Sequence, residues 1–345
     1  ISEDSTNSIV SIEASGISVA DSGVFVLTPS NSDTGIYSYD GDTWDEFTLP
    51  SSGDWRGIAA GNNRFVAVKN NSSEAAYSTN GVDWTASTLT ASRDWKAVIY
   101  GKPAGVSTGI FVAVAGNLNS GAYSINGSSW SSTTLPTAGD STICDWHDIA
   151  FGAGVFVAIA NEQNVVAVGT WNGTTLTWSP AIMDVISDST RKQWTSITYG
   201  NRRFVAVTDT GEGAWSFDGI TWYPQGAANH TLPEFDDSTE HSWQRVRYGQ
   251  GVFFAIGNTG GRTVGADPTT GPTLLAATSY DGIVWETRTL ATEQNWAIAM
   301  FGNPDVTLGD STVSNSKPTW ILATNDSSNK INKVYAGARA LGRVV

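Results

Sequence analysis

The segment DWRGIAAGNNRFVAV (54–68) decides the fold, because it recurs five more times along the chain, each time with a tryptophan near its start. The lead tryptophans of the six copies are spaced by 40, 51, 48, 49 and 53 residues. A period near 40–50 residues with several short strands per unit is typical of β-propellers and differs from the period of about 33–34 of helical repeats. These lead residues are Trp55, Trp95, Trp146, Trp194, Trp243 and Trp296.

Each unit has a second half, such as YSTNGVDW (77–84), in which an Asn-Gly or Asp-Gly pair precedes a closing tryptophan. Such pairs accept positive φ at both turn positions, so we expect type I′ hairpins here. The unit then contains four strands: one with the lead tryptophan, a continuously apolar FVAV-like strand buried on both faces, the YS strand, and one with the closing tryptophan. The closing residues are Trp44, Trp84, Trp130, Trp178, Trp222 and Trp285.

The repeat predicts one closed domain over residues 1–345, a seven-bladed β-propeller of four-stranded antiparallel blades, with six or eight blades as alternatives. Both tryptophan series are predicted to pack between blades. We interpret the chain as an excerpt of a longer protein. The expected blades cover about 8–51, 54–91, 94–137, 145–184, 193–233, 242–292 and 295–345.

Composition excludes several classes of protein. The chain has 33 Asp and Glu against 19 Lys and Arg, a net charge of −14, which argues against nucleic-acid binding. No apolar run approaches the ~20 residues that span a bilayer, so no membrane insertion is expected. The single cysteine, Cys144, excludes an internal disulfide framework, and we expect a buried, inert thiol.

Variable loops are predicted to gather on one face of the propeller, near the fifth and sixth expected blades (193–233 and 242–292), and loops on a rigid scaffold often carry binding residues. The alternative is that these loops are merely tolerated insertions. Trp171 lies at a variable position beside a hairpin turn, where we expect its side chain to be exposed. It is therefore a further candidate for contact with a carbohydrate or a protein. Calcium is an alternative occupant of the acidic loop, although no ligand spacing supports a metal site or any cofactor. The loop candidates are His230, Glu234, Asp236, Asp237, Glu240, His241 and Arg262.

No catalytic set is assignable from the residues. The chain has no GxSxG elbow, no P-loop and no GxGxxG motif between a strand and a helix. Acidic residues are too numerous for a pair suited to glycoside hydrolysis to be chosen. His147 follows a lead tryptophan and is predicted to be structural or to face solvent. We therefore expect a protein that is not an enzyme.

The segments SYDGDTW (38–44), STNGVDW (78–84), SINGSSW (124–130) and SFDGITW (216–222) resemble the Asp-box of sialidase-like (BNR) propellers, with a turn one residue shorter. The resemblance implies a propeller and little about activity. Sialidases carry an arginine triad, but no arginine precedes Arg56 here. Arg56, Arg245 and Arg247 are expected on inner strands near the central channel, although no family motif maps onto them.

The fuller repeat looks like those of large virion proteins of tailed phages. This resemblance implies a non-enzymatic structural or receptor-binding propeller at the virion surface, in an extracellular setting. Its partners would be other virion proteins and a host-surface glycan or protein, with multiple copies in an assembly. A sialidase-like hydrolase active on glycans and a bacterial surface adhesin or lectin are the alternatives.

Overall fold

The computed structural model shows a protein built from β-strands and turns, and none of the described residues lies in a helix. In the described part of the chain, accordingly, no helix has the length and apolar character needed to cross a membrane. The prediction of an all-β protein is confirmed. The described residues are 2–4, 14–19, 24–39, 43–137, 143–161, 163–183, 193–209, 211–225, 232, 242–249, 251–258, 273–294, 296–302, 307–308, 311–312, 319–324 and 331–335.

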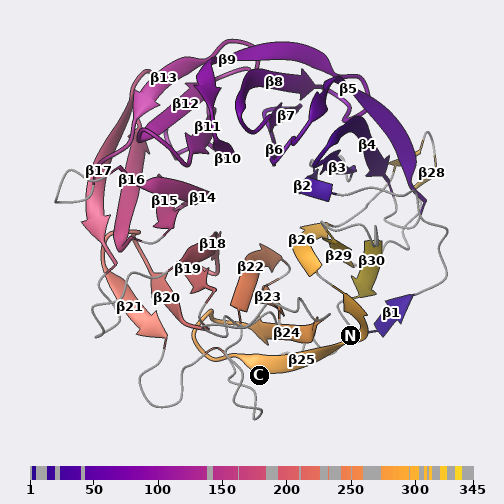
Figure 1. The fold of residues 1–345 in the computed structure, drawn as a ribbon. Helices are drawn as coiled ribbons and strands as arrows, with labels where there is room; N and C mark the ends of the chain where they lie inside the picture. Colours follow the sequence, from indigo (N-terminus) through magenta and orange to yellow (C-terminus); the bar gives the residue numbers. More distant parts are fainter. Residues whose placement is uncertain are drawn as a thin grey trace, which may run out of the picture.

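The strands form four-stranded antiparallel sheets, here called blades, in which the four strands follow one another from the centre of the molecule to its rim (Figure 1). The inner strands are β2 (Ala14–Val19), β6 (Gly57–Gly61), β10 (Trp95–Gly101), β14 (Asp145–Gly152), β18 (Trp194–Gly200), β22 (Ser242–Gly249) and β26 (Trp296–Gly302). The second strands are β3 (Phe25–Pro29), β7 (Arg64–Val68), β11 (Ile110–Ala115), β15 (Val155–Asn161), β19 (Arg203–Thr208), β23 (Val252–Asn258) and β29 (Thr319–Thr324).

The remaining strands complete the blades on the outside. The third strands are β4 (Ser32–Ser38), β8 (Ser72–Ser78), β12 (Ser120–Ser124), β16 (Val165–Trp171), β20 (Gly213–Ser216), β24 (Thr273–Ser279) and β30 (Ile331–Tyr335). The outer strands are β5 (Asp45–Gly53), β9 (Thr85–Arg93), β13 (Ser131–Thr134), β17 (Leu176–Ile182), β21 (Trp222–Gln225), β25 (Glu286–Gln294) and β1 (Ser2–Asp4). A separate ribbon pairs β27 (Thr307–Leu308) with β28 (Ser311–Thr312).

Six blades are formed by four consecutive strands each, from β2–β5 to β22–β25. A further sheet has the order β26-β29-β30-β1, so its outer strand comes from the N-terminal end of the chain. The last expected blade, 295–345, would take all four of its strands from the C-terminal end of the chain. Residues 336–345 lie outside the described residues, and Ser2–Asp4 pairs with β30 at this position instead.

The inner strands contact one another in a closed ring, which makes the fold a β-propeller (Figure 1). Each blade therefore has two neighbours and buries both of its faces, as the continuously apolar second strands predicted. The predicted architecture of four-stranded antiparallel blades is confirmed. The contacts run β2–β6, β6–β10, β10–β14, β14–β18, β18–β22, β22–β26 and β26–β2.

Lead tryptophans and second-strand phenylalanines fill the space between blades. They are the largest side chains that are almost wholly buried, and aromatic residues of this size contribute most to burial in a core. The packing role predicted for the lead tryptophans is confirmed where their side chains are described. The buried residues are Trp55, Trp95, Trp146, Trp194, Trp243, Phe25, Phe65, Phe111, Phe156, Phe204 and Phe253.

The hairpins between third and outer strands are not of the expected type I′. Gly127 has a φ of +73°, but Asn126 is not among the residues with positive φ. The Asn126 Oδ1 atom instead accepts hydrogen bonds from the Ser128 and Ser129 amides, both at 3.0 Å, and the Ser124 hydroxyl accepts one from the Gly127 amide at 2.8 Å. The side chain thus closes the turn, which removes the need for a second left-handed residue.

Turns of the I′ kind occur instead between inner and second strands. Asn62 and Asn63 have φ values of 51° and 56°, and Asn201 and Arg202 have 43° and 63°. In both cases two residues separate the paired strand ends, which is the loop length that favours a I′ turn. The sequence prediction therefore had the right turn type at the wrong end of the unit.

Candidate functional site

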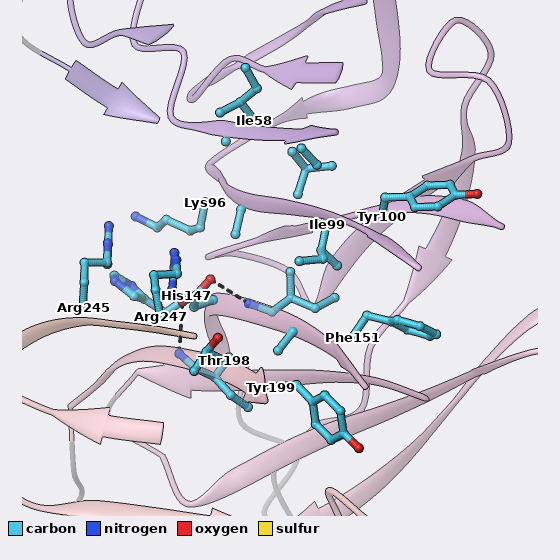
Figure 2. A pocket seen from close by; sticks show the side chains of 18 of the residues that line it. Ile58, Lys96, Ile99, Tyr100, His147, Phe151, Thr198, Tyr199, Arg245 and Arg247 are labelled. Carbon is cyan, nitrogen blue, oxygen red and sulfur yellow. Dashed lines mark hydrogen bonds and ion pairs between the residues drawn. The ribbon is translucent and has the colours of Figure 1, made fainter. Parts of the chain in front are cut away.

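A cavity of about 290 Å³ lies at the centre of the ring and is lined by the inner strands β6, β10, β14, β18 and β22 and by Arg56 just before β6. Figure 2 shows its two ends: Lys96, His147, Arg245 and Arg247 gather on one side, and aromatic side chains lie on the other. The charged side chains come from the beginnings and middles of the strands. The site is therefore composed of side chains from several blades.

A β-bulge helps to aim the charged side chains. In β14 the register with β15 shifts between Trp146 and Asp148, so His147 has no partner in the ladder. The same shift follows the lead tryptophan in β10 and β22. Bulges twist a strand and redirect its side chains, and here they let a strand bury its tryptophan between blades while presenting polar neighbours to the centre.

Among the described residues four cationic side chains line the cavity, and three of them form an ion pair with a carboxylate. The paired lysine, Lys96, is well covered, with 15% of its side chain exposed. Such pairs leave little net charge for a ligand. The three ion pairs are Arg56–Asp54 at 2.9 Å, Lys96–Asp94 at 2.8 Å and Arg247–Asp148 at 3.4 Å.

Asp148 joins three blades through its buried carboxylate. Its Oδ2 atom accepts hydrogen bonds from the Ser196 hydroxyl at 2.9 Å and the Ile197 amide at 3.1 Å, and Oδ1 accepts one from the Ile149 amide at 2.9 Å. Burial alone raises the pKa of this carboxyl, but the charges of Arg247 and then Arg245, followed by hydrogen bonds from two backbone amides, outweigh burial and hold the pKa below its usual range. Asp148 is therefore ionised and fully engaged.

Arg245 differs from the other three cations of the cavity. Within the described residues its guanidinium forms no ion pair, and its hydrogen bonds go to the carbonyl oxygens of Thr195 at 3.2 Å and Gln244 at 3.3 Å. Burial lowers the pKa of Arg245 to about 10, against the opposing effect of Asp148. The group is still protonated at neutral pH, so it is a half-buried positive charge without a bonded counterion among the described residues.

His147 lies within this group of cations (Figure 2). Burial lowers the pKa of His147 to about 4, the nearby charge of Arg245 lowers it further, and Asp148 opposes the shift. Its Nδ1 atom is buried and has no hydrogen-bond partner in the described part of the protein. His147 is therefore neutral at pH 7, and the prediction of a structural or solvent-facing histidine missed its place in the cavity.

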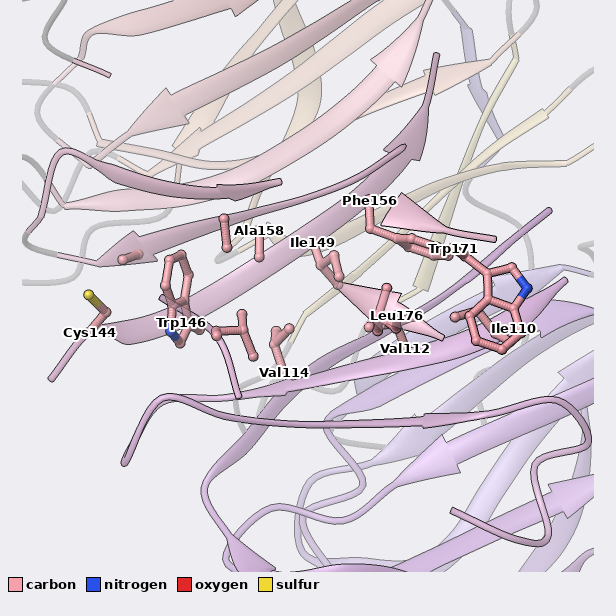
Figure 3. Close-up of a cluster of buried hydrophobic side chains, with 13 residues drawn as sticks. Ile110, Val112, Val114, Cys144, Trp146, Ile149, Phe156, Ala158, Trp171 and Leu176 are labelled. Atoms are coloured by element: carbon pink, nitrogen blue, oxygen red, sulfur yellow. The ribbon is translucent and has the colours of Figure 1, made fainter. Parts of the chain in front are cut away.

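Trp171 is not the exposed contact residue that we expected. Its side chain is only 6% exposed and packs in a cluster with Ile110, Phe156 and Leu176 (Figure 3). Its indole N–H donates to the carbonyl oxygen of Thr108, in the loop of the preceding blade, at 3.0 Å. The stretched hairpin of this blade turns the ring inward, so the prediction of exposure is wrong here.

The equivalent positions in four other blades are exposed. Tyr39, Ile125, Phe217 and Tyr280 show 39%, 50%, 50% and 53% of their surface. Cys144 is buried, as expected for an inert thiol, and its Sγ contacts the Gln163 side-chain oxygen at 3.2 Å.

The candidates predicted in the acidic loop and in the long insertion fall outside the described residues. They are His230, Glu234, Asp236, Asp237, Glu240, His241 and Arg262. In the part of the chain that the structure describes, no three His, Cys, Asp or Glu side chains group so as to hold a metal ion.

One sequence signal for the cavity was available. Arg56, Lys96 and His147 occupy the same repeat position, directly after a lead tryptophan, in three successive units. Arg56, Arg245 and Arg247 were expected near the channel, and the structure places all three in its lining. What the sequence did not reveal is which cations are paired, because Asp148 and Arg247 are far apart in the chain.

No protein-family model matches the chain, and no curated protein matches it in sequence. Several solved structures are similar to it in fold. A streptogramin B lyase has a TM-score of 0.68 at 12% identity, covering 94% of this chain and 95% of its own. Catalytically inactive virginiamycin B lyase from Staphylococcus aureus, with quinupristin, has a TM-score of 0.67 at 12% identity, and the match covers 97% of both chains. YCF48 bound to D1 peptide has 0.61 at 13%, covering 95% and 94%.

At this identity the similarity shows the fold, a β-propeller spanning nearly the whole chain. These neighbours are lyases and YCF48, not phage structural proteins, so the prediction of a virion component is wrong. The virion partners and the extracellular location that went with it stay predictions. The sialidase-like resemblance finds no support in a family match.

Proposed function

We propose that this protein is a ligand-binding β-propeller whose central cavity captures an anionic group. The observation that carries the proposal is Arg245, a half-buried guanidinium in the cavity lining with no ion-pair partner among the described residues. Placing an uncompensated charge in a protein interior is costly, and a bound anion would offset that cost. Lys96 and Arg247 in the same lining are neutralised by Asp94 and Asp148, so Arg245 is the cation left for a ligand.

Binding without catalysis fits the state of the two groups best placed for acid–base chemistry. The carboxylate of Asp148 already accepts three hydrogen bonds and has a lowered pKa, which makes it a weak base. His147, with a pKa of about 4, is also a weak base at neutral pH. Among the neighbours, virginiamycin B lyase is solved with quinupristin and YCF48 with a D1 peptide, so propellers of this shape do bind ligands.

We further infer that residues 1–345 form one domain of seven blades. The closed ring of contacts between inner strands supports this count, together with the pairing of β1 with β30. A crystal structure tests it: six or eight sheets around the axis would contradict the inference.

Thermal unfolding with a panel of sodium salts tests the anion site. Acetate, sulfate, phosphate and methanesulfonate are compared at equal ionic strength, and at least one is expected to raise the unfolding temperature of the wild-type protein. The Arg245→Gln variant should lose this response. Arg288→Gln, which removes an equal charge from outer strand β25, should keep it. Absence of any anion response, or an equal response in Arg245→Gln, refutes the proposed function.

A further inference from the structure

The charges around the cavity set the charge of the ligand group. Its lining carries four cations, and three of them form ion pairs with a carboxylate of this chain. His147 adds no charge at neutral pH. Among the described residues this leaves one uncompensated positive charge, on Arg245. A ligand group with a single negative charge brings the site to neutrality, whereas a dianion would leave an excess of negative charge in a confined space.

Hydrogen bonding points to the same residue. Arg247 shares one strand with Arg245 but is committed to the protein: its Nη1 donates to the Ser196 hydroxyl at 2.8 Å and the Val246 carbonyl at 2.9 Å, and lies 3.4 Å from Asp148. Among the described residues both guanidiniums are engaged through Nη1 alone, but that of Arg245 bonds only carbonyl oxygens and no carboxylate. A guanidinium has five N–H donors in a planar fork, so Arg245 keeps donors for a ligand.

We propose that Arg245 is the anchoring residue of the cavity and that the group it binds is a carboxylate, held by the guanidinium fork. This inference rests on the proposed anion site and names its ligand class. A planar carboxylate matches two parallel N–H donors, and such charge-assisted pairs are the strongest that a guanidinium forms with a monoanion of this size. A free organic acid and the carboxyl end of a peptide share this chemistry.

The two arginines should then respond in opposite directions in the protein without ligand. Arg245→Gln removes a half-buried charge that has no bonded counterion among the described residues, so the variant should unfold at a higher temperature than the wild-type protein. Arg247→Gln deprives the buried Asp148 carboxylate of its partner, so it should unfold at a lower temperature. A merely structural role of Arg245 would make both variants less stable.

Binding is measured by calorimetry with trifluoroacetate, methanesulfonate and, at pH 8, hydrogen phosphate. The first two carry one charge and stay ionised throughout, but only the first is planar at its charged group. We expect trifluoroacetate to bind about tenfold more tightly than either of the others, and Arg245→Gln to weaken it by about tenfold or more. N-acetylglycine, which resembles a peptide end, is compared with its uncharged amide, and we expect only the acid to bind.

The outcomes separate the inference from the proposed function. If methanesulfonate or phosphate binds as tightly as trifluoroacetate through Arg245, the anion site stands and the carboxylate assignment is overturned. If Arg245→Gln is destabilised as Arg247→Gln is, Arg245 is a structural residue and the inference fails. If the amide binds as well as N-acetylglycine, the charge is not what is recognised. If no anion binds, both proposals fail. Tighter binding of N-acetylglycine than of trifluoroacetate supports a peptide end as the source, and the reverse supports a free acid.

Discussion

Replacing Asp148 by alanine should destabilise the protein more than any other single change in the cavity lining. The carboxylate connects β14 to β18 through Ser196 and Ile197 and to β22 through Arg247. Without it, two buried backbone amides, those of Ile149 and Ile197, lose their acceptor. The substitution therefore acts on three blades at once.

The expected cost follows from these contacts. Each orphaned buried donor costs about 1–3 kcal/mol, and removing one partner of a buried ion pair costs about 3–5 kcal/mol in total. Arg247 keeps 30% of its side chain exposed, so water compensates part of its loss. We expect Asp148→Ala to lower the free energy of unfolding by about 3–5 kcal/mol and Asp148→Asn, which keeps one acceptor, by about 2 kcal/mol.

Urea unfolding at several pH values measures this effect. Because the folded protein holds the pKa of Asp148 below its usual range, the carboxylate stabilises the fold above pH ~4 and this contribution is lost as pH falls further. The difference between wild type and Asp148→Ala should therefore shrink on acidification. A loss below about 1 kcal/mol at pH 7, or a difference that does not depend on pH, would refute the reasoning.

Three further changes test other parts of the fold. Gly152→Ala would place a Cβ against the ring atoms of Tyr199 and should lower the free energy of unfolding by about 1–3 kcal/mol. Gly154→Ala should cost less, because the space there is open and only the positive φ opposes the side chain. A lower unfolding temperature for Gly154→Ala than for Gly152→Ala would contradict this packing. Asn126→Asp should change the free energy of unfolding by less than about 0.5 kcal/mol, because other blades have aspartate at this position. Asn126→Ala should lower it by about 1–2 kcal/mol, because the turn loses its side-chain acceptor. Equal urea midpoints for Asn126→Ala and the wild type would show that the turn does not depend on the side chain. The pKa of His147 in the folded protein is about 4, so protonation of this side chain favours the unfolded state below pH ~6.5. As pH falls from about 6.5 to 4, the free energy of unfolding of the wild type should fall by about 3 kcal/mol relative to His147→Gln. Parallel plots of unfolding free energy against pH for the two proteins would rule this out.

Much of the fold was predictable because the repeat records it. The spacing of Trp55, Trp95 and Trp146 predicted the blade, and the apolar run around Phe65 predicted a strand buried on both faces. Turn type was harder to predict, because Asn126 can close a turn by its side chain or by its backbone, and composition does not distinguish the two. The prediction that Trp171 is exposed was wrong for a similar local reason, because a longer hairpin lets its side chain pack against the preceding blade.

The cavity was predictable only in part. That Arg245 and Arg247 lie near the axis follows from their positions after a lead tryptophan. The sequence does not show which of the two arginines forms an ion pair. That pairing depends on Asp148, which lies 99 residues from Arg247 in the chain, and on a β-bulge in the strand of Asp148. Contacts between distant blades leave no periodic trace in a single sequence.

The pairing of Ser2–Asp4 with β30 has a consequence for how the molecule is made. Most strand pairs join neighbours in the chain and form quickly, but this one closes a loop of more than 300 residues. By loop-closure entropy alone, that step costs about 1–2 kcal/mol more than closing a single blade. During synthesis from the N-terminus, Arg56 to Arg247 emerge before β26, β29 and β30. All the cations of the described lining are thus synthesised before the strands that close the ring.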